Sequence, residues 1–197
     1  MRRFLISLTV LLFFVTGCSR GRNDSEKAAQ TAYEGYYKAI EENERFAASS
    51  LYYHISAQMS NMPDGTHRYY VFLDDAQVAM YDVVMMAVEN NITFDRSQKM
   101  MPSVGIFDTT EYSLIPYQSN SDAGFVKGLV LGGECEDREI LLKILVEWKD
   151  RNHEKVTREF LSMKLTPDGF SWPEENITET PAPAEETAEP EESEENE

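Results

Sequence analysis

Cysteine and histidine are scarce in this chain of 197 residues, which has two cysteines and three histidines. The cysteines are Cys18 and Cys135, so a modified Cys18 would leave Cys135 without an intramolecular disulfide partner. The fold must then be held together by its hydrophobic core. His54, His67 and His153 show no metal-ligand spacing with the cysteines or with one another. The sequence therefore predicts no metal site and no cofactor.

Basic residues are also few, with 18 Lys and Arg against 35 Asp and Glu and a formal net charge of −17. Residues 173–197 hold eleven glutamates and no Lys or Arg. A nucleic-acid partner is excluded, because no basic stripe is present to neutralise phosphates and release counterions. The segment 173–197 has almost no large apolar residue, so it is predicted to be a disordered acidic tail.

Sequence motifs of catalysis are missing as well. No glycine-rich phosphate loop occurs, and Gly132-Gly133 is interpreted as a turn pair. No G-x-S-x-G elbow or Ca²⁺-loop register is found. Acidic neighbours should raise the pKa of the Cys135 thiol rather than activate it. No carboxylate pair is singled out as acid and base, so no catalytic residue is assigned and the protein is not predicted to be an enzyme.

The N-terminus is the most informative stretch. Arg2 and Arg3 form a basic region, and an apolar run of about a dozen residues follows over 4–15. That run matches the hydrophobic region of a signal peptide and is too short for a membrane-spanning helix, which needs roughly 20 residues. Residues 1–17 are therefore predicted to be a signal peptide.

The sequence Val15-Thr16-Gly17-Cys18 resembles the lipobox of bacterial lipoproteins, although Val15 stands where that family more often has Leu. The resemblance implies that the chain is cut before Cys18 and that Cys18 carries a diacylglyceryl lipid. It further implies an extracytoplasmic protein anchored to a bacterial membrane. It covers the first tenth of the chain and therefore concerns location rather than activity.

Downstream of the lipid site, residues 18–24 are expected to form a short flexible tether. Residues 25–45 then show helical periodicity, with apolar or aromatic residues at three- and four-residue steps. This pattern predicts a stalk helix that packs on the body through its tyrosines. The residues of this stripe are Ala29, Ala32, Tyr33, Tyr36, Tyr37 and Ile40.

The body, residues 46–172, changes to a period of two, which is typical of β-strands. Residues 77–89 also suit a helix, but their valines favour a strand buried on both faces. Asp82 within this segment is expected to face solvent. The predicted hairpins are 51–59 with 67–73 and 140–149 with 156–165, and the other predicted strands are 103–108, 112–117 and 125–131.

These strands predict a mostly β fold, an antiparallel β-sandwich preceded by one N-terminal helix. The alternative is an α+β roll, in which the helix lies on one curved sheet. Residues 81–91, an apolar run ending in polar residues, loosely resemble a strand of the immunoglobulin-like domains of small bacterial lipoproteins. That resemblance implies a binding or structural module and supplies no functional residues.

The expected function is a non-catalytic binding or scaffolding module of the cell envelope. The alternative is an envelope enzyme or small-solute receptor whose site is assembled only in the fold. Besides the membrane, the partner is expected to be an envelope protein or a glycan. The adjacent pairs Tyr52, Tyr53 and Tyr69, Tyr70 are candidates for the interaction surface, because one tyrosine of each pair must face away from the core.

Overall fold

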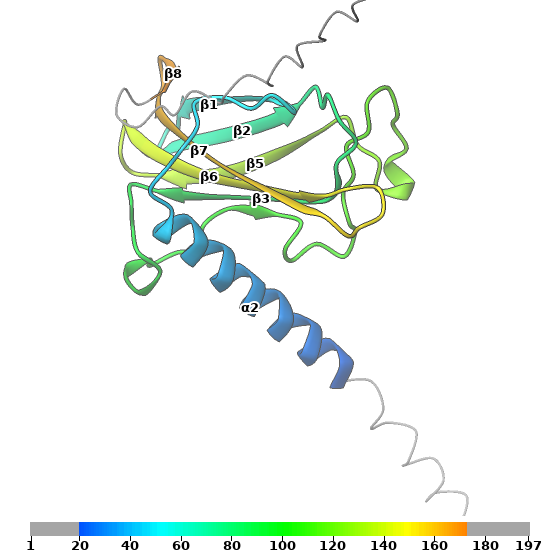
Figure 1. Cartoon of the computed structure of the whole chain (residues 1–197). Coiled ribbons are helices and arrows are strands. Elements are labelled where there is room, and N and C mark those ends of the chain that lie inside the picture. Colours follow the sequence, from blue (N-terminus) through cyan, green and yellow to red (C-terminus); the bar gives the residue numbers. More distant parts are fainter. Residues whose placement is uncertain (1–19, 173–197) are drawn as a thin grey trace, which may run out of the picture.

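The protein is built from three layers (Figure 1), as seen in a computed structural model that describes residues 20–172. The first layer is a three-stranded sheet of β1 (His54–Asn61), β2 (His67–Asp74) and β5 (Gly128–Cys135). The second is a five-stranded sheet of β4 (Ser103–Val104), β3 (Tyr81–Glu89), β6 (Ile140–Lys149), β7 (Val156–Thr166) and β8 (Gly169–Ser171). The third is the helix α2 (Arg20–Glu42), and the short 3-10 helices η1 (Phe94–Arg96) and η2 (Ser121–Ala123) lie in loops.

Both sheets are antiparallel, with strand orders β1-β2-β5 and β4-β3-β6-β7-β8. This is the order of an immunoglobulin-like sandwich, with strands A, B and E in one sheet and C′, C, F and G in the other. No D strand is present among residues 20–172, and β8 extends the second sheet. The predicted β-sandwich with one N-terminal helix is confirmed. The α+β roll is wrong, because two sheets face each other and the helix lies outside them.

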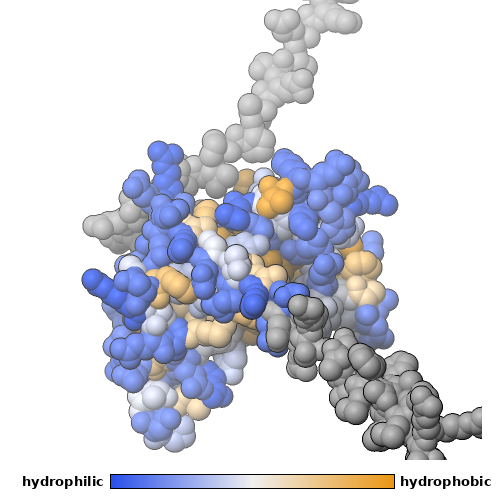
Figure 2. Space-filling model, turned by 90° about the horizontal axis from the view of Figure 1, so that it is seen from below, coloured by the Kyte–Doolittle hydropathy of each residue, from blue (hydrophilic) through white to orange (hydrophobic). Residues whose placement is uncertain are grey.

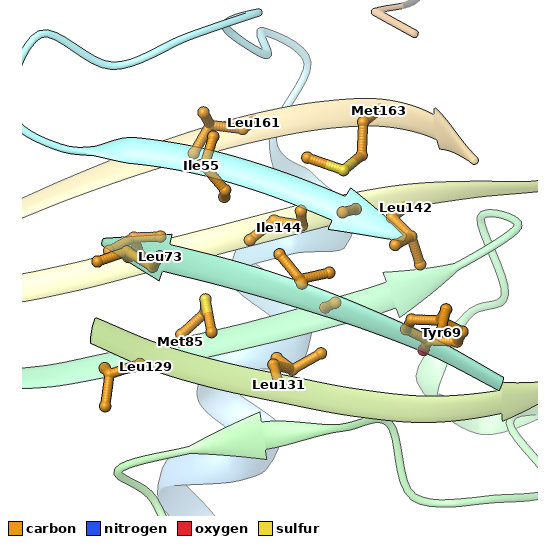
Figure 3. Packing of buried hydrophobic residues seen from close by; sticks show 14 of the residues in the cluster. Ile55, Tyr69, Leu73, Met85, Leu129, Leu131, Leu142, Ile144, Leu161 and Met163 are labelled. Carbon is orange, nitrogen blue, oxygen red and sulfur yellow. The ribbon is translucent and has the colours of Figure 1, made fainter. Parts of the chain in front are cut away.

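The main core fills the space between the two sheets (Figure 3). The alternation read from residues 140–149 holds, since every second residue of β6, from Ile140 to Trp148, belongs to this core. The opposing sheet contributes Tyr69, Val71 and Leu73 from β2, all fully buried. The two predicted hairpins are observed as the antiparallel pairs β1 with β2 and β6 with β7, although the first strand is His54–Asn61 instead of residues 51–59.

A second, smaller core lies between the five-stranded sheet and α2. Tyr33, Tyr37 and Ile40 of the helix are buried against Met86 and Leu145 of the sheet. The Tyr37 hydroxyl donates a 2.7 Å hydrogen bond to the Ile92 carbonyl, which satisfies it at the edge of this core. The tyrosine stripe is therefore a packing face. The same core explains why β3 is buried on both faces, as predicted, although the strand begins at Tyr81 instead of residue 77.

The helix differs from its predicted bounds. It begins at Arg20 instead of residue 25, so residues 20–24 are helical and are not the flexible tether that was expected. No residue is buried between 24 and 32, and Figure 1 shows this half of α2 projecting from the body. Twelve helical residues from Arg20 to Thr31 span about 18 Å. The predicted signal peptide 1–17, Cys18 and the predicted disordered tail 173–197 lie outside the described residues.

Several strand bounds also differ from prediction. Only residues 103–104 of the segment 103–108 form a strand, and residues 112–117 form isolated bridges within a long loop. The strand predicted at 125–131 lies at 128–135, so Gly132 and Gly133 are not a turn pair. They are opposite Tyr70 and Tyr69 in the β2–β5 register, where they leave room for the two rings.

No helix among residues 20–172 is long and apolar enough to span a membrane. Seen from the side on which α2 lies (Figure 2), the surface is mainly hydrophilic, with small scattered apolar areas. Almost all of the buried hydrophobic residues belong to the two internal cores described above.

Candidate binding surface

The outer face of the three-stranded sheet carries aromatic residues that no described element covers. Tyr70 and Phe72 lie on its central strand β2, are half-buried, and have ring centroids 6.3 Å apart. Val130, their neighbour on β5, is 52% exposed. This face lies on the opposite side of the sandwich from α2, because the helix packs on the outside of the other sheet. We call Tyr70, Phe72 and Val130 the aromatic platform.

Gly132 determines how Tyr70 lies on the sheet. The two residues are directly opposite each other, and a Cβ added at Gly132 would be 3.2 Å from two carbons of the Tyr70 ring. The ring therefore occupies the space that a side chain at position 132 would take, and it leans over β5. An alanine there would have to displace the ring.

Charged residues border the platform at both ends, and they are paired with each other. Arg68 Nε donates a 3.0 Å hydrogen bond to Glu134 Oε1 at one end, and His54 Nδ1 lies 2.8 Å from Asp74 Oδ1 at the other. Glu134 first, and the Tyr70 hydroxyl after it, raise the pKa of Arg68. Both carboxylates on this face thus have a partner, and the centre of the platform is uncharged.

A groove of about 640 Å³ continues from the platform across the free edge of β5. Tyr70, Gly132 and Gly133 line one side of it. Met100 and Phe107, which are 61% and 44% exposed, lie in the segment that lines the other side. A second hollow of about 700 Å³ lies beside the groove, and the two share Glu89, Lys99, Met101 and Glu134.

The wall between the two hollows contains a buried ion pair. The Glu89 side chain is only 4% exposed, and its Oε2 lies 2.8 Å from Lys99 Nζ. Glu89 Oε1 accepts a 2.5 Å hydrogen bond from the Tyr69 hydroxyl. Lys99 also donates to the backbone carbonyl of Glu134 on the free edge of β5. Both oxygens of the carboxylate are thus engaged, which is what makes its burial tolerable.

Cys135 lines the second hollow and is a protonated thiol. Burial, followed by the nearby Glu89 carboxylate, raises the pKa of Cys135 to about 11, and Lys99 only partly opposes this shift. The sequence predicted a raised pKa for this thiol because of its acidic neighbours. The direction is correct, but burial is a larger cause than the neighbouring carboxylates. A thiol of this kind is a poor nucleophile at neutral pH.

A separate polar cluster surrounds Asp82 at the other end of β3. Asp82 occupies a β-bulge with φ = 49°, and its Oδ2 accepts hydrogen bonds from Lys149 Nζ at 3.0 Å and His153 Nδ1 at 2.8 Å. Burial alone would raise the pKa of Asp82, but these two donors outweigh it and lower the pKa. The expectation of a solvated Asp82 is wrong, because the bulge turns the side chain towards its two partners at the sandwich end.

The four tyrosines proposed from sequence do not form one surface. Tyr53 and Tyr69 are buried in the main core, and only Tyr70 lies on the platform. Tyr52 is 39% exposed and packs against Trp148, with ring centroids 5.5 Å apart. The expected split of each pair into inward and outward members is therefore observed, but the two outward members lie in different places.

Sequence reasoning missed Phe72, Met100 and Phe107. Phe72 was detectable, because it has the same strand parity as Tyr70 and must point to the same face. Met100 and Phe107 lie in loops, where no periodicity predicts orientation. Within residues 20–172, no group of three or more His, Cys, Asp or Glu side chains is placed to hold a metal ion. Comparisons with known proteins find no matching family model, curated protein or solved structure.

Proposed function

We propose that this protein is a non-catalytic binding module of the bacterial cell envelope, anchored to a membrane by lipid on Cys18. The ligand-binding surface in this proposal is the aromatic platform with its adjoining groove. The observation that carries the proposal is the outer sheet face around the half-buried Tyr70 and Phe72, over which no element of the described residues lies. Tyrosine and phenylalanine on a surface supply large apolar contact area at low entropic cost, which is typical of interfaces.

The position of α2 supports this arrangement. The helix leads back towards Cys18, and its exposed half separates the sandwich from that end by about 18 Å. The platform lies on the opposite side of the sandwich (Figure 1). A protein anchored through Cys18 would therefore present the platform away from its own membrane.

The groups near the groove favour binding over chemistry. Glu89 is held by Lys99 and Tyr69, and the Cys135 thiol has a pKa of about 11. The alternative function is a small-solute receptor or enzyme that uses the second hollow, and the observation in its favour is the buried Glu89 carboxylate in the wall of that hollow. A Glu89→Gln change would then abolish function, whereas the platform proposal requires Tyr70.

The lipid anchor is tested by membrane fractionation of the Cys18→Ser variant. We expect wild-type protein in the membrane fraction, and Cys18→Ser either released or left unprocessed, because two acyl chains give stable anchoring. Normal processing and membrane retention of the variant would contradict the anchor.

The binding surface is tested by chemical cross-linking in intact cells. We expect cross-links from the wild type that disappear in a Tyr70→Ala/Phe72→Ala double variant. The matched control is Tyr117→Ala, which removes a fully exposed tyrosine from a loop outside the platform. Identical cross-links in all three proteins would refute the platform as the binding surface.

A further inference from the structure

We propose that the aromatic platform binds a linear, uncharged polysaccharide, whose sugar rings stack on Tyr70 and Phe72. This inference rests on the proposed function and specifies its ligand. The C–H bonds on one face of a pyranose ring carry partial positive charge, and the face of an aromatic ring is negative. Two aromatic rings in a row, 6.3 Å apart along β2, offer stacking positions for successive sugars of one chain.

The size of the face argues against a protein partner. Three strands of eight residues cover about 14 Å by 27 Å, or roughly 400 Å². A stable protein–protein interface buries about 800 Å² of accessible surface on each partner, and a flat footprint of this size supplies less than that unless neighbouring loops add to it. The face is therefore small for a second copy of this chain, whereas its length accommodates several sugar rings of a single glycan chain.

The charge pattern argues for an uncharged ligand. The Arg68–Glu134 ion pair and the 2.8 Å contact between His54 Nδ1 and Asp74 Oδ1 engage the charged groups at the two ends of the face. No unpaired cation on this face is left to hold a phosphate or carboxylate, within the described residues. An anionic polymer would have to break an existing pair before it could bind.

Polar side chains flank the rings where sugar hydroxyls would lie. Gln58 and Ser56 of β1 are directly opposite Tyr70 and Phe72 in the sheet register. Gln58 is exposed, and its amide offers both a donor and an acceptor. Neighbouring aromatic faces and neutral hydrogen-bonding groups together form a surface suited to polyhydroxylated rings.

The groove gives the chain a continuous path beyond the platform. Tyr70 belongs to the platform and also lines the groove together with Gly132, and the far side of the groove presents Phe107 and Met100. A glycan that crosses Tyr70 and passes over the side-chain-free backbone of Gly132 would therefore reach a third aromatic ring.

The experiment is isothermal titration of the full mature protein in detergent micelles with two probes, chitohexaose and cellohexaose. We expect one of them to bind. Tyr70→Ala should weaken its association constant at least about tenfold, as expected for loss of an aromatic anchor. Tyr70→Phe, which keeps the stacking surface, should stay within about threefold of wild type. Tyr117→Ala is the matched control and should bind like wild type.

Circular dichroism of each variant verifies that the fold is kept. Absence of binding to both oligosaccharides, or binding by Tyr70→Ala equal to wild type, overturns the inference. The cross-linking experiment then separates the two proposals. If platform-dependent cross-links are to a protein and no oligosaccharide binds, the binding module stands and the polysaccharide is wrong. If cross-links are also unchanged in the double variant, both proposals are wrong.

Discussion

The Tyr69 hydroxyl donates a 2.5 Å hydrogen bond to Glu89 Oε1, and this bond joins the two sheets of the sandwich. Tyr69 belongs to β2 of the three-stranded sheet and Glu89 ends β3 of the five-stranded sheet. Both residues are buried, and the partly exposed Lys99 pairs with the other oxygen of the Glu89 carboxylate. A polar contact thus fixes the two layers at the end of the sandwich that adjoins the groove.

Removing this hydroxyl should destabilise the protein. We expect Tyr69→Phe to lower the free energy of unfolding by about 1–3 kcal/mol, because Glu89 loses one of its two partners while remaining buried. Urea denaturation followed by circular dichroism measures the change. Tyr117→Phe removes a fully exposed hydroxyl and should be neutral. Equal stability of the two variants would show that the Tyr69–Glu89 bond contributes nothing.

Gly133 should be intolerant of any side chain. A Cβ at this position would lie 2.8 Å from Tyr69 Cε1 and closer still to the ring carbon and hydroxyl beyond it. Tyr69 cannot move away easily, since it is fully buried and bonded to Glu89. We expect Gly133→Ala to cost about 1–3 kcal/mol of unfolding free energy by overpacking.

The control for Gly133 is Gly35 in α2. A Cβ at Gly35 meets nothing within 4 Å. Gly35→Ala should therefore stabilise the helix by about 0.5–1 kcal/mol. Thermal or urea denaturation of both variants checks the pair, and a Gly133→Ala protein as stable as wild type would contradict the close approach of Tyr69.

Most of the correct strand predictions came from the local periodicity of apolar residues in the sequence. The bounds of β6 agree with residues 140–149, since inward and outward residues alternate there without interruption. The strand buried on both faces was predicted for residues 77–89 from its valines, and it is observed at Tyr81–Glu89, where α2 covers its outer face. In segments without alternation the predictions were poorer: of the strands predicted at 103–108 and 112–117, only Ser103–Val104 is a strand and the second is a set of isolated bridges.

Long-range relations could not be read from the sequence. Gly132 and Gly133 look like a turn by themselves, and only the pairing of β5 with β2 shows that they make room for Tyr70 and Tyr69. The outward orientation of Tyr70 followed from strand parity, whereas Tyr52 and Tyr53 precede β1 and are oriented by a bend. Whether Tyr70 is covered depends on which sheet face α2 packs against, which is a tertiary property.

Trp148 should be among the most costly residues to truncate. It is 4% exposed, and the rings of Tyr52 and Tyr53 pack against it with centroids 5.5 Å and 5.9 Å away. We expect Trp148→Ala to lower the free energy of unfolding by about 3–5 kcal/mol, through lost burial and the cavity that remains. Trp172→Ala, at the partly buried edge of the core, should cost clearly less in the same denaturation experiment.

Cys135 should react slowly with thiol reagents. In a Cys18→Ser chain it is the only thiol, and its pKa of about 11 leaves about one molecule in a thousand as thiolate at pH 8. We expect a reaction with Ellman's reagent at least about a hundredfold slower than for the same chain unfolded in urea. A native rate close to the unfolded rate would show that Cys135 is neither buried nor shifted.

Asp82 should make stability depend on acid pH. Burial opposes ionisation of Asp82, but the hydrogen bonds from His153 and Lys149 prevail and lower its pKa in the folded state. A lowered pKa means that the contribution of Asp82 to stability is present above its unfolded pKa of about 3.9. That contribution is lost as the pH falls through the folded value.

Asp82→Asn tests this dependence and keeps a residue type that accepts the left-handed backbone at φ = 49°. We expect the variant to be less stable than wild type by about 1 kcal/mol at pH 7, and the difference to shrink towards zero near pH 2. The matched control is Asp75→Asn, at an exposed aspartate with φ = 48°, and it should show no such convergence. Urea denaturation of the three proteins between pH 7 and pH 2 measures these differences in the free energy of unfolding. A difference between Asp82→Asn and wild type that stays constant from pH 7 to pH 2 would mean that the Asp82 charge has no part in holding Lys149 and His153 at the end of the sandwich.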